Sequence, residues 1–376
     1  MTSSAPLNGT VVVEIGHSIA APFAGLVLGQ LGAEVIKVEA PGGGDHARNW
    51  GPPLHDGAAA IFHAMNRDKL GVALDLRQAS EREALVQLIV ERADVVVQNL
   101  RPGSIEELGL GALALTRRNP RLIYCNLSAF GPGGPLSTKP GYDPLMQAYG
   151  GLMSVTGEAE GQAVRVGVSI IDVGTGMWSV IGILAALLER ARTGRGGIVD
   201  TSLYETALSW MGAHIADYSS GGTDSRRYGS GAAQIVPYET FETADNHLMV
   251  AAGNDALFGK LSTVVGRPQW TQDERFCTNR ARVSNRSVLS ALLRDVFREQ
   301  STAYWRERLD AAGVPNAPLQ TIAEVVRDEQ TEALEILQPI AEARATAVGL
   351  PIRFDGARPK LRRGAPRLGE HTSEVI

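Results

Sequence analysis

The stretch TVVVEIGHSIAAPFAGLVLGQLGAEVIKVEAP (Thr10–Pro41) decides the fold class. Its β-branched run Thr10–Gly16 is typical of a buried parallel strand. The segment Ala21–Ala33 has helical spacing, with Pro22 suited to the first helical turn, and a second strand follows in EVIKVEAP. These features predict a β-α-β unit at the start of the chain, which is the building block of a parallel sheet.

The same alternation continues along the chain. Further strands are predicted at Gly71–Leu76, Asp94–Leu100 and Leu122–Phe130, with a helix at Glu81–Arg92. The apolar run Val166–Asp172 is predicted to be a strand that leads into another helix, and GGIVDTSLY is predicted to be the next strand. Repeated strand–helix order predicts an α/β fold with a doubly wound, mostly parallel sheet.

The composition and the hydrophobic pattern of the sequence change in its second half. Tyr218–Gln234 is rich in Gly and Ser and is typical of a long connection. A hairpin pattern, YETFETADNHLMVAAG, and helical patterns at Asp255–Val265, Val288–Glu299 and Thr302–Ala312 indicate a smaller α+β domain. We therefore predict a large domain whose first part is residues 1–217, a linker and small domain at 218–319, and a return segment at 320–376 that completes the large domain.

Composition excludes several classes of protein. A net charge of −5 argues against a nucleic-acid binder, which would need a basic face. The two cysteines, Cys125 and Cys277, form no CxxC or Cys/His cluster, so we expect neither a disulfide framework nor a metal site. No signal peptide is recognised, and the apolar run Trp178–Leu188 is shorter than the ~20 residues of a bilayer crossing. We expect a cytoplasmic protein with no membrane partner.

One carboxylate, Asp172, has three possible roles. It lies between the apolar run and the helix, with no neighbouring acid, histidine or lysine in the sequence. Asp is a strong N-cap residue, so capping alone accounts for its position. Alternatively, it lies near the phosphates of a dinucleotide, or it is itself the reacting group.

The dinucleotide interpretation depends on Gly174-Thr175-Gly176, with Asp200 at the end of the next strand as the ribose acid. Ser179 stands where a third glycine or alanine belongs, and this argues against nicotinamide binding. The turn Gly16–Pro22 has too few glycines for a phosphate loop, yet it suits the nucleotide end of a larger cofactor because strand C-termini face the binding crevice. Gly229-Ser230-Gly231 lacks the strand and helix of a hydrolase nucleophile elbow.

Several segments in one order resemble a known family. The chain is similar to the class III coenzyme A-transferases, the superfamily of formyl-CoA and carnitine CoA-transferases that also includes α-methylacyl-CoA racemase. The likeness covers the whole length. Besides the stretch around Asp172, it is carried by LGAEVIKVEAPGGGD (Leu31–Asp45), NRDKLGVALDL (Asn66–Leu76), DVVVQNLRPG (Asp94–Gly103), GYDPLMQAYGG (Gly141–Gly151), VAAGND (Val250–Asp255) and the tail APRLGEHTSEV.

The resemblance implies that Asp172 is the catalytic aspartate of a CoA-transferase. Its carboxylate would attack an acyl-CoA thioester to give a mixed anhydride, then an aspartyl-CoA thioester that a free carboxylic acid opens. Acyl-CoA is then the substrate, with no metal and no nicotinamide. The resemblance also implies a homodimer of two interlocked chains.

The resemblance also carries over binding residues. CoA contacts are expected from the first turn and from two later strand ends, and the acyl pocket and a covering glycine loop from two other segments. The CoA set is His17, Ser18, Ile19, Ala20, Leu74, Arg77, Asn99, Leu100 and Arg101; the pocket and loop set is Tyr142, Asp143, Gly229, Ser230, Gly231 and Ala232.

This chain departs from the family pattern at some of these places. Ala40 stands where formyl-CoA transferase has an arginine near the adenine, Ile19 replaces a glutamine, and Glu107 falls where an arginine is expected. Arg101, Lys37 or Arg77 are the basic residues available for the phosphates instead. The glycine loop is also less glycine-rich than in the family.

Two other functions remain open. A racemase of this family uses a histidine where this chain has Tyr142, and a phenol of pKa ~10 is a poor base at neutral pH. This substitution favours CoA transfer over racemisation, with Tyr142 lining the acyl pocket and Asp143 orienting a neighbour or bonding backbone amides. A non-catalytic CoA-binding protein is the third alternative.

Overall fold

A six-stranded parallel sheet forms the centre of the larger of two units in the computed structural model, which describes residues 5–54, 57–222, 224–340 and 343–376. The strand order is β3-β2-β1-β4-β5-β6, and all the pairings between neighbours are parallel. The predicted α/β class is therefore confirmed. The strands are β1 (Val11–Ile15), β2 (Glu34–Glu39), β3 (Lys69–Ala73), β4 (Val95–Gln98), β5 (Ile123–Ser128) and β6 (Gly197–Ser202).

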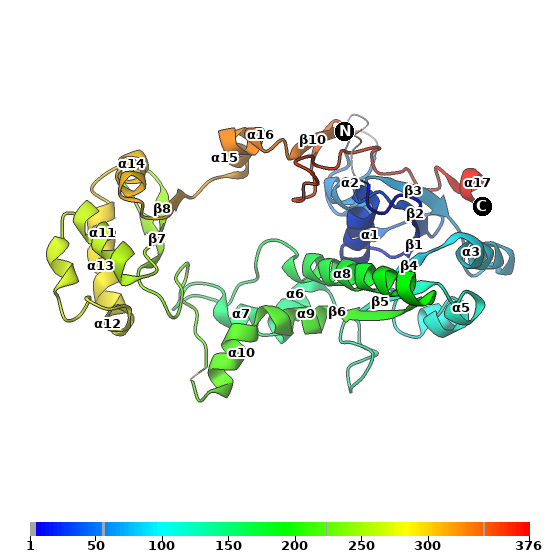
Figure 1. The fold of residues 1–376 in the computed structure, drawn as a ribbon, viewed down its shortest axis with the longest axis horizontal. Helices are drawn as coiled ribbons and strands as arrows, with labels where there is room; N and C mark the ends of the chain where they lie inside the picture. The colour runs from blue at the N-terminus through cyan, green and yellow to red at the C-terminus, as the bar shows by residue number, and fades with distance from the viewer. Residues whose placement is uncertain (1–4, 55–56, 223, 341–342) are drawn as a thin grey trace. The chain divides into compact units, whose positions relative to one another are not determined.

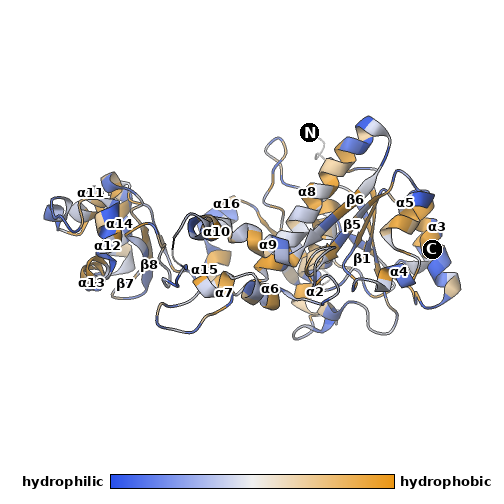
Figure 2. Ribbon diagram, turned by 90° about the horizontal axis from the view of Figure 1, so that it is seen from below, coloured by the Kyte–Doolittle hydropathy of each residue, from blue (hydrophilic) through white to orange (hydrophobic). Residues whose placement is uncertain are grey.

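Helices cover both faces of this sheet (Figures 1 and 2). On one face, Val13 and Ile36 pack in a core with Leu85 and Ile89 of α3 (Ala79–Arg92). The opposite face carries α1 (Ala20–Gln30) and α8 (Ile170–Thr193), which pack against each other. The remaining helical segments of this unit are η1 (His46–Asn49), α2 (Ala60–Asn66), α4 (Ser104–Glu107), α5 (Ala112–Arg118), α6 (Asp143–Tyr149), α9 (Leu203–Trp210), α16 (Glu329–Ala333) and α17 (Thr372–Val375).

The strand predicted at Val166–Asp172 is wrong. The helix α8 begins at Ile170 and continues through both glycines to Thr193. A Cβ at Gly174 would lie 2.7 Å from Trp210 of α9, and one at Gly176 would lie 2.8 Å from the backbone oxygen of Ala20. These glycines therefore permit close helix packing and do not form a phosphate loop, which removes the basis of the dinucleotide interpretation.

The helix α8 is also longer than the apolar run suggests. Its 24 residues are apolar and long enough, by length and composition alone, to cross a membrane, so the length argument made from Trp178–Leu188 is wrong. In this structure α8 packs against α1, β5 and β6, and it buries the polar side chains of Thr175 and Ser179. One face of α8 is therefore part of the core of this unit, while other apolar side chains of the helix are exposed.

The chain divides into two units, each described by itself. The expected boundary after residue 217 lies at residue 212, and residues 152–165 and 320–328 belong to the second unit rather than to the large domain. Unit 1 consists of residues 1–151, 166–212 and 329–376, and unit 2 of residues 152–165 and 213–328.

The second unit has its own core and a three-stranded antiparallel sheet of order β7-β8-β9. The predicted hairpin and the three predicted helices are present. Its elements are α7 (Leu152–Val155), α10 (Gly212–Ser219), β7 (Tyr238–Glu242), β8 (His247–Ala251), α11 (Asp255–Val264), η2 (Pro268–Thr271), α12 (Asn279–Ser284), α13 (Arg286–Phe297), α14 (Thr302–Ala312), β9 (Asn316–Pro318) and α15 (Ile322–Arg327).

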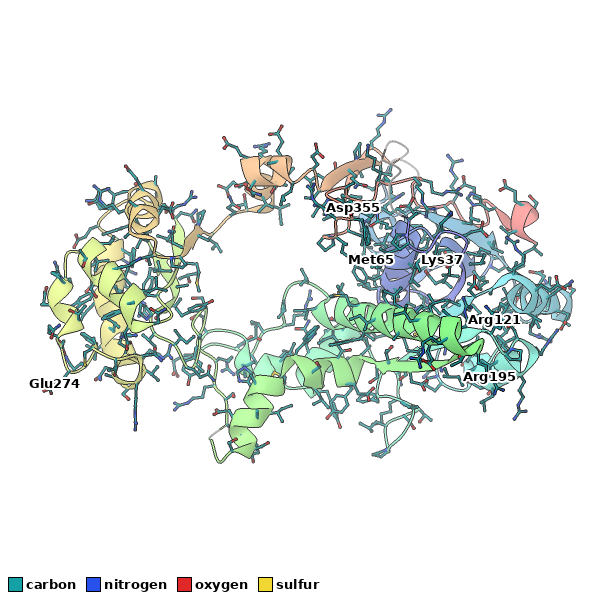
Figure 3. All side chains as sticks on the ribbon, in the orientation of Figure 1. Lys37, Met65, Arg121, Arg195, Glu274 and Asp355 are labelled. Carbon is teal, nitrogen blue, oxygen red and sulfur yellow. The ribbon has the colours of Figure 1, made fainter. Side chains whose placement is uncertain are left out.

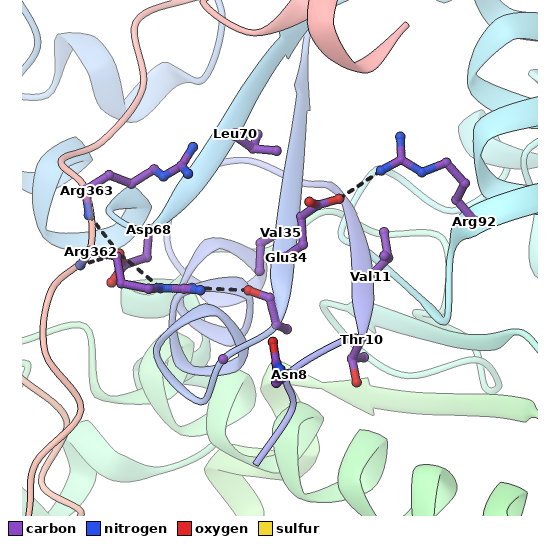
Figure 4. Close-up of a pocket in the computed structure, with 13 residues that line it drawn as sticks. Asn8, Thr10, Val11, Glu34, Val35, Asp68, Leu70, Arg92, Arg362 and Arg363 are labelled. Carbon is purple, nitrogen blue, oxygen red and sulfur yellow. Dashed lines mark hydrogen bonds and ion pairs between the residues drawn. The ribbon is translucent and has the colours of Figure 1, made fainter. Parts of the chain in front are cut away.

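The C-terminal segment folds onto the first unit, after a short hairpin of β10 (Leu337–Ile340) and β11 (Ala345–Val348). One oxygen of the buried Asp68 accepts hydrogen bonds from the backbone amides of Arg362 (2.8 Å) and Arg363 (3.0 Å). Figure 4 shows these contacts at the wall of a cavity of about 390 Å³. Asp68 therefore attaches the returning segment to the sheet.

The segment also pairs with β3. The backbone amide of Gly71 donates to His371 Nδ1 (3.1 Å), and the backbone amide of His371 donates to the Gly71 oxygen (2.8 Å). The amide of Ala73 donates to Thr372 Oγ1 (3.0 Å). The outer strand of the sheet is thus covered by the tail.

We predict that Asp68→Ala destabilises unit 1 by about 2 kcal/mol, because two backbone amides lose a charged acceptor. Denaturant unfolding should show a lower midpoint, and hydrogen exchange should be faster in residues 362–372. Asp75→Ala is the control, since Asp75 is partly exposed and its side chain bonds the neighbouring Arg77. Equal exchange of the tail in the wild type and in Asp68→Ala would contradict the attachment.

Candidate active site

The N-terminus of α8 is capped from another helix. Its N-cap residue, Ser169, makes no side-chain capping bond, and Asp172 is the third residue of the helix rather than its cap. Instead, Oδ2 of Asp143 accepts hydrogen bonds from the backbone amides of Ile171 (2.7 Å) and Asp172 (3.2 Å). The capping interpretation of Asp172 is therefore wrong, because Asp143 performs that role.

Asp143 is itself held firmly. It begins α6, it is only 2% exposed, and its Oδ1 accepts a hydrogen bond from Gln147 Nε2 at 2.6 Å. Gln147 in turn accepts the backbone amide of Val166 (2.8 Å), in the segment that enters α8. A carboxylate buried with three donors has a fixed position, so the backbone of Asp172 is fixed as well.

Asp172 faces a cavity of about 420 Å³. Its side chain has no hydrogen bond or ion pair with any residue in the described ranges, and 9% of the residue is exposed. The cavity lies at the carboxyl ends of β1, β4 and β5, where ligands of open α/β sheets bind. Its lining consists of His17, Ser18, Ala20, His46, Asn99, Leu100, Arg101, Pro102, Leu127, Ser128, Ala129, Lys139, Pro140, Gly141, Tyr142, Asp172 and Leu203.

The surroundings of Asp172 favour its neutral form. Burial, and then the negative charge of Asp143, raise the pKa of Asp172 to about 7. Its position in the first turn of a helix lowers the pKa, because the helix dipole favours a negative charge there, but this effect is smaller than the other two. The sequence shows no acid next to Asp172, so only the fold reveals Asp143 as its neighbour.

The first turn brings three of the expected residues, His17, Ser18 and Ala20, to the cavity. Ser18 has a left-handed backbone (φ 72°), which is uncommon for a residue with a side chain. Asn99 bonds both backbone groups of His17, through Oδ1 to its amide (3.0 Å) and Nδ2 to its oxygen (2.9 Å). Burial lowers the pKa of His17, and its Nδ1 lies 3.0 Å from Ser18 Oγ. The turn is therefore rigid before any ligand binds.

The cavity carries more basic groups than the sequence analysis identified. Arg101 was expected, whereas Lys139 and His46 were missed. His46 follows β2 directly after Asp45, so the rule that strand ends face the crevice was the available signal. Lys139 lies in the loop after β5, and no sequence pattern marks it.

A second cavity of about 450 Å³ shares His17, His46 and Leu100 with the first. It also contains the expected Leu74 and Arg77, at the end of β3. The Arg77 guanidinium is highly exposed and pairs with Asp75 at 2.8 Å. The two cavities together bring most of the expected CoA set to one edge of the sheet.

Two expected residues are placed elsewhere. Ile19 is buried at the start of α1 and is not among the residues that line the Asp172 cavity. Lys37 lies inside the unit (Figure 3), where its Nζ is 2.9 Å from both Glu14 Oε1 and Asp45 Oδ2. Its side chain is fully buried, so the suggestion that Lys37 binds phosphates is wrong.

The expected glycine loop lies in the second unit. Ser230 Oγ accepts the backbone amide of Thr240 (2.9 Å) and lies 2.7 Å from Thr240 Oγ1. Gly229 has φ 63° and donates its amide to the Gly157 oxygen (3.0 Å), while Arg286 donates to the oxygen of Ala232 (2.8 Å). Gly231 donates to the Tyr228 oxygen (2.9 Å). The loop is hydrogen-bonded within its own unit at each of its four residues.

Within the described part of the chain, no group of three or more His, Cys, Asp or Glu side chains is placed to hold a metal ion.

Comparison with known proteins identifies the family. The sequence model of CoA-transferase family III matches residues 7–372. The succinyl-CoA:glutarate CoA-transferase of Mus musculus is 33% identical, over 100% of this chain and 86% of that protein, and the acetyl-CoA:oxalate CoA-transferase of Acetobacter aceti is 35% identical, over 97% and 93%. A crystal structure of a CAIB/BAIF family protein from Brucella suis is 39% identical, with a TM-score of 0.88 over 98% of both chains.

We predict that Asp172→Asn stabilises the protein at high pH. Because the folded pKa lies above the unfolded value of 3.8, the wild type loses stability as pH rises towards about 7. The neutral amide avoids this loss, which amounts to about 4 kcal/mol above pH 7. Unfolding of both proteins in denaturant, measured from pH 4 to pH 8.5, should give curves that diverge with pH. A constant difference across that range would show that the carboxylate is not perturbed.

Proposed function

This chain belongs to CoA-transferase family III, and from that premise we propose that Asp172 is the nucleophile that accepts an acyl group from CoA. Relatives of this chain are CoA-transferases that act on acyl-CoA and carboxylates, and this chain is such an enzyme. The observation that carries the role is that Asp172 faces a cavity with no cation bound to its carboxylate among the described residues. A carboxylate in a strong ion pair would be a weak nucleophile.

The proposed reaction proceeds by two exchanges at Asp172. A carboxylate oxygen attacks the thioester carbonyl, the C–S bond breaks, and CoA leaves as a thiolate, which gives a mixed anhydride. The thiolate then attacks the aspartyl carbonyl, which releases the donor acid and leaves an aspartyl-CoA thioester. The acceptor carboxylate repeats these steps in reverse, so that new acyl-CoA and free Asp172 are formed.

The surroundings of Asp172 fit a group that is alternately charged and acylated. Its pKa of about 7 leaves a substantial ionised fraction in the free enzyme at neutral pH, and acylation removes the negative charge that this position disfavours. Asp143 holds the backbone amides of Ile171 and Asp172, so it fixes the attacking group without touching its carboxylate. Asp143 is thus proposed as a positioning residue.

The two cavities suit the two ends of acyl-CoA. We place the thioester in the cavity with Asp172 and Tyr142, and the nucleotide end beside Leu74 and Arg77. Arg101 and Lys139 are the proposed phosphate partners, because neither side chain bonds a described residue. A diphosphate and a 3′-phosphate require several such cations.

We further propose that the acceptor is a dicarboxylic acid. Glutarate, oxalate, citramalate and mesaconate, the acceptors in the names of four relatives, are all dicarboxylates. The Asp172 cavity is lined by two cationic side chains, Arg101 and Lys139, and two histidines, and Asp172 is the single acid among its described lining residues. That charge balance suits an anionic substrate.

The exposed face of α8 is relevant to the assembly. On α8, the apolar side chains Met177, Trp178, Ile181 and Leu188 are 40–72% exposed. Their spacing puts them on one helical face, and exposed apolar patches of this kind mark interaction sites. We propose that a second copy of the chain covers this face, as expected for an interlocked homodimer.

The nucleophile role is tested by Asp172→Ala. Exchange of CoA between succinyl-CoA and glutarate should fall by about a thousandfold or more, with the fold intact by circular dichroism. When wild type is incubated with succinyl-CoA and then quenched, mass spectrometry should find CoA bound as a thioester to the peptide that contains Asp172. Asp200→Asn is the control, since it removes the acid that the dinucleotide interpretation would need, and its transfer activity should be unchanged.

Two results would contradict this assignment. If Asp172→Ala still transfers CoA, Asp172 is not the nucleophile. Deuterium incorporated at the α-carbon of a 2-methylacyl-CoA in heavy water, without transfer to any acid, would favour the racemase instead.

The dimer is tested by Ile181→Glu, which places a charge in the apolar face. Light scattering should give a dimer mass for wild type and a monomer mass for the variant. Arg192→Glu, at an exposed polar position of the same helix, should remain a dimer. A monomeric wild type would contradict the proposal.

A further inference from the structure

We propose that Asp45 is a positioning residue for acyl-CoA binding, because it holds together the two segments that form the wall shared by both cavities. One segment is the first turn with His17 and Ser18, and the other is η1, which begins at His46. The inference rests on the proposed function, since it concerns the site for acyl-CoA.

The contacts of Asp45 join these segments directly. Its Oδ1 accepts the backbone amide of Ser18 (2.8 Å) and that of Ala47 (2.9 Å). The residue is 2% exposed, so these bonds do not compete with solvent. One oxygen atom therefore fixes the distance between two loops that follow different strands.

The wall itself consists of two imidazoles. His17 precedes Ser18 and His46 precedes Ala47, so each ring is carried by a residue adjacent to an amide that Asp45 binds. The ring centroids are 5.3 Å apart, edge to face. Both rings line the cavity with Asp172 and the cavity with Arg77, so a ligand that occupies both cavities must contact this pair.

The carboxylate of Asp45 is anchored from the sheet. Its Oδ2 pairs with Lys37 Nζ at 2.9 Å, and Lys37 also donates to the Gly16 oxygen (2.9 Å). Its backbone amide donates to Glu39 Oε1 (2.8 Å), a group that Arg48 holds with two further bonds. Burial alone would raise the pKa of Asp45, but Lys37 and the two backbone amides lower it, so Asp45 stays ionised.

The nucleophile does not depend on Asp45. Asp172 is fixed on the other side of the cavity by Asp143, through bonds to the backbone of α8. Loss of Asp45 should therefore loosen the binding wall and leave the chemical step in place. Ser18 is the sensitive point, because its left-handed backbone has to be held by its surroundings.

Asp68 offers a matched control. It is likewise almost fully buried (4% exposed), and one of its oxygens also accepts two backbone amides, those of Arg362 and Arg363. It lines neither cavity of the site. Comparing Asp45→Ala with Asp68→Ala thus separates loss of a buried carboxylate from loss of this particular wall.

The experiment measures KM and kcat for succinyl-CoA with glutarate as acceptor, together with CoA affinity by calorimetry. For Asp45→Ala we expect KM and the CoA dissociation constant to rise about tenfold or more, with kcat within about threefold of wild type. Asp68→Ala should lower stability and leave all three values unchanged. Asp45→Asn keeps an oxygen for both amides, so it should recover most of the lost affinity.

The outcomes are distinguishable from a failure of the proposed function. A wild type that neither binds CoA nor transfers it would overturn the function itself. If wild type binds CoA, two results overturn the inference alone: equal affinities in Asp45→Ala and Asp68→Ala, or an equal drop in kcat and kcat/KM for Asp45→Ala. If Asp45→Ala does not fold, Asp45→Asn decides: a partial loss of CoA affinity, with shifted ring signals of His17 and His46 in an otherwise dispersed NMR spectrum, supports the inference, and unchanged affinity with unchanged ring signals overturns it.

Discussion

A buried group of two lysines and two acids holds together the first three strands and the turn that carries His17 and Ser18. Lys37 on β2 pairs with Glu14 on β1 and with Asp45, and Lys69 on β3 pairs with the other oxygen of Glu14 at 2.7 Å. Lys69 also donates to the Pro22 oxygen in the first turn of α1 (2.8 Å). Removing one member of such a buried group costs about 3–5 kcal/mol, because an uncompensated charge remains.

The acids of this buried group are paired with lysines, and Asp172 at the candidate site is in the opposite situation. Glu14 and Asp45 are paired with lysines, whereas the carboxylate of Asp172 has Asp143 for its neighbour and no ion pair with any cation among the described residues. Burial lowers the pKa of Lys69 to about 8 in spite of Glu14, whereas Glu14 and Asp45 raise the pKa of Lys37 in spite of burial. The fold therefore fixes the wall proposed to bind acyl-CoA with strong ionic contacts, and it raises the free energy of the charged form of the proposed nucleophile, as active sites commonly do.

Much of the sheet was predictable because the strands are short and β1, β2, β4 and β6 are rich in β-branched residues. The start of α8 was not, since Gly174 and Gly176 normally indicate a break and here serve packing against Trp210 and Ala20. Local propensity was overridden by tertiary contact. Asp172 was recognisable as a candidate, but its neighbour Asp143 is 29 positions away, and Lys139 and His46 join it only through the topology of the sheet. Lys37 was expected to bind phosphates, because nothing in the sequence shows that Glu14 and Asp45 enclose its side chain.

The docking of the tail on β3 has a consequence for biosynthesis. Gly71 meets His371 only 300 positions later, so on the ribosome the outer strand is made long before its cover exists. During that interval its free amides and carbonyls are open to pairing with other chains, which is the usual origin of aggregation at sheet margins. Nascent chains of this protein should therefore need protection, by a chaperone or by slow release, until residues 362–372 have emerged.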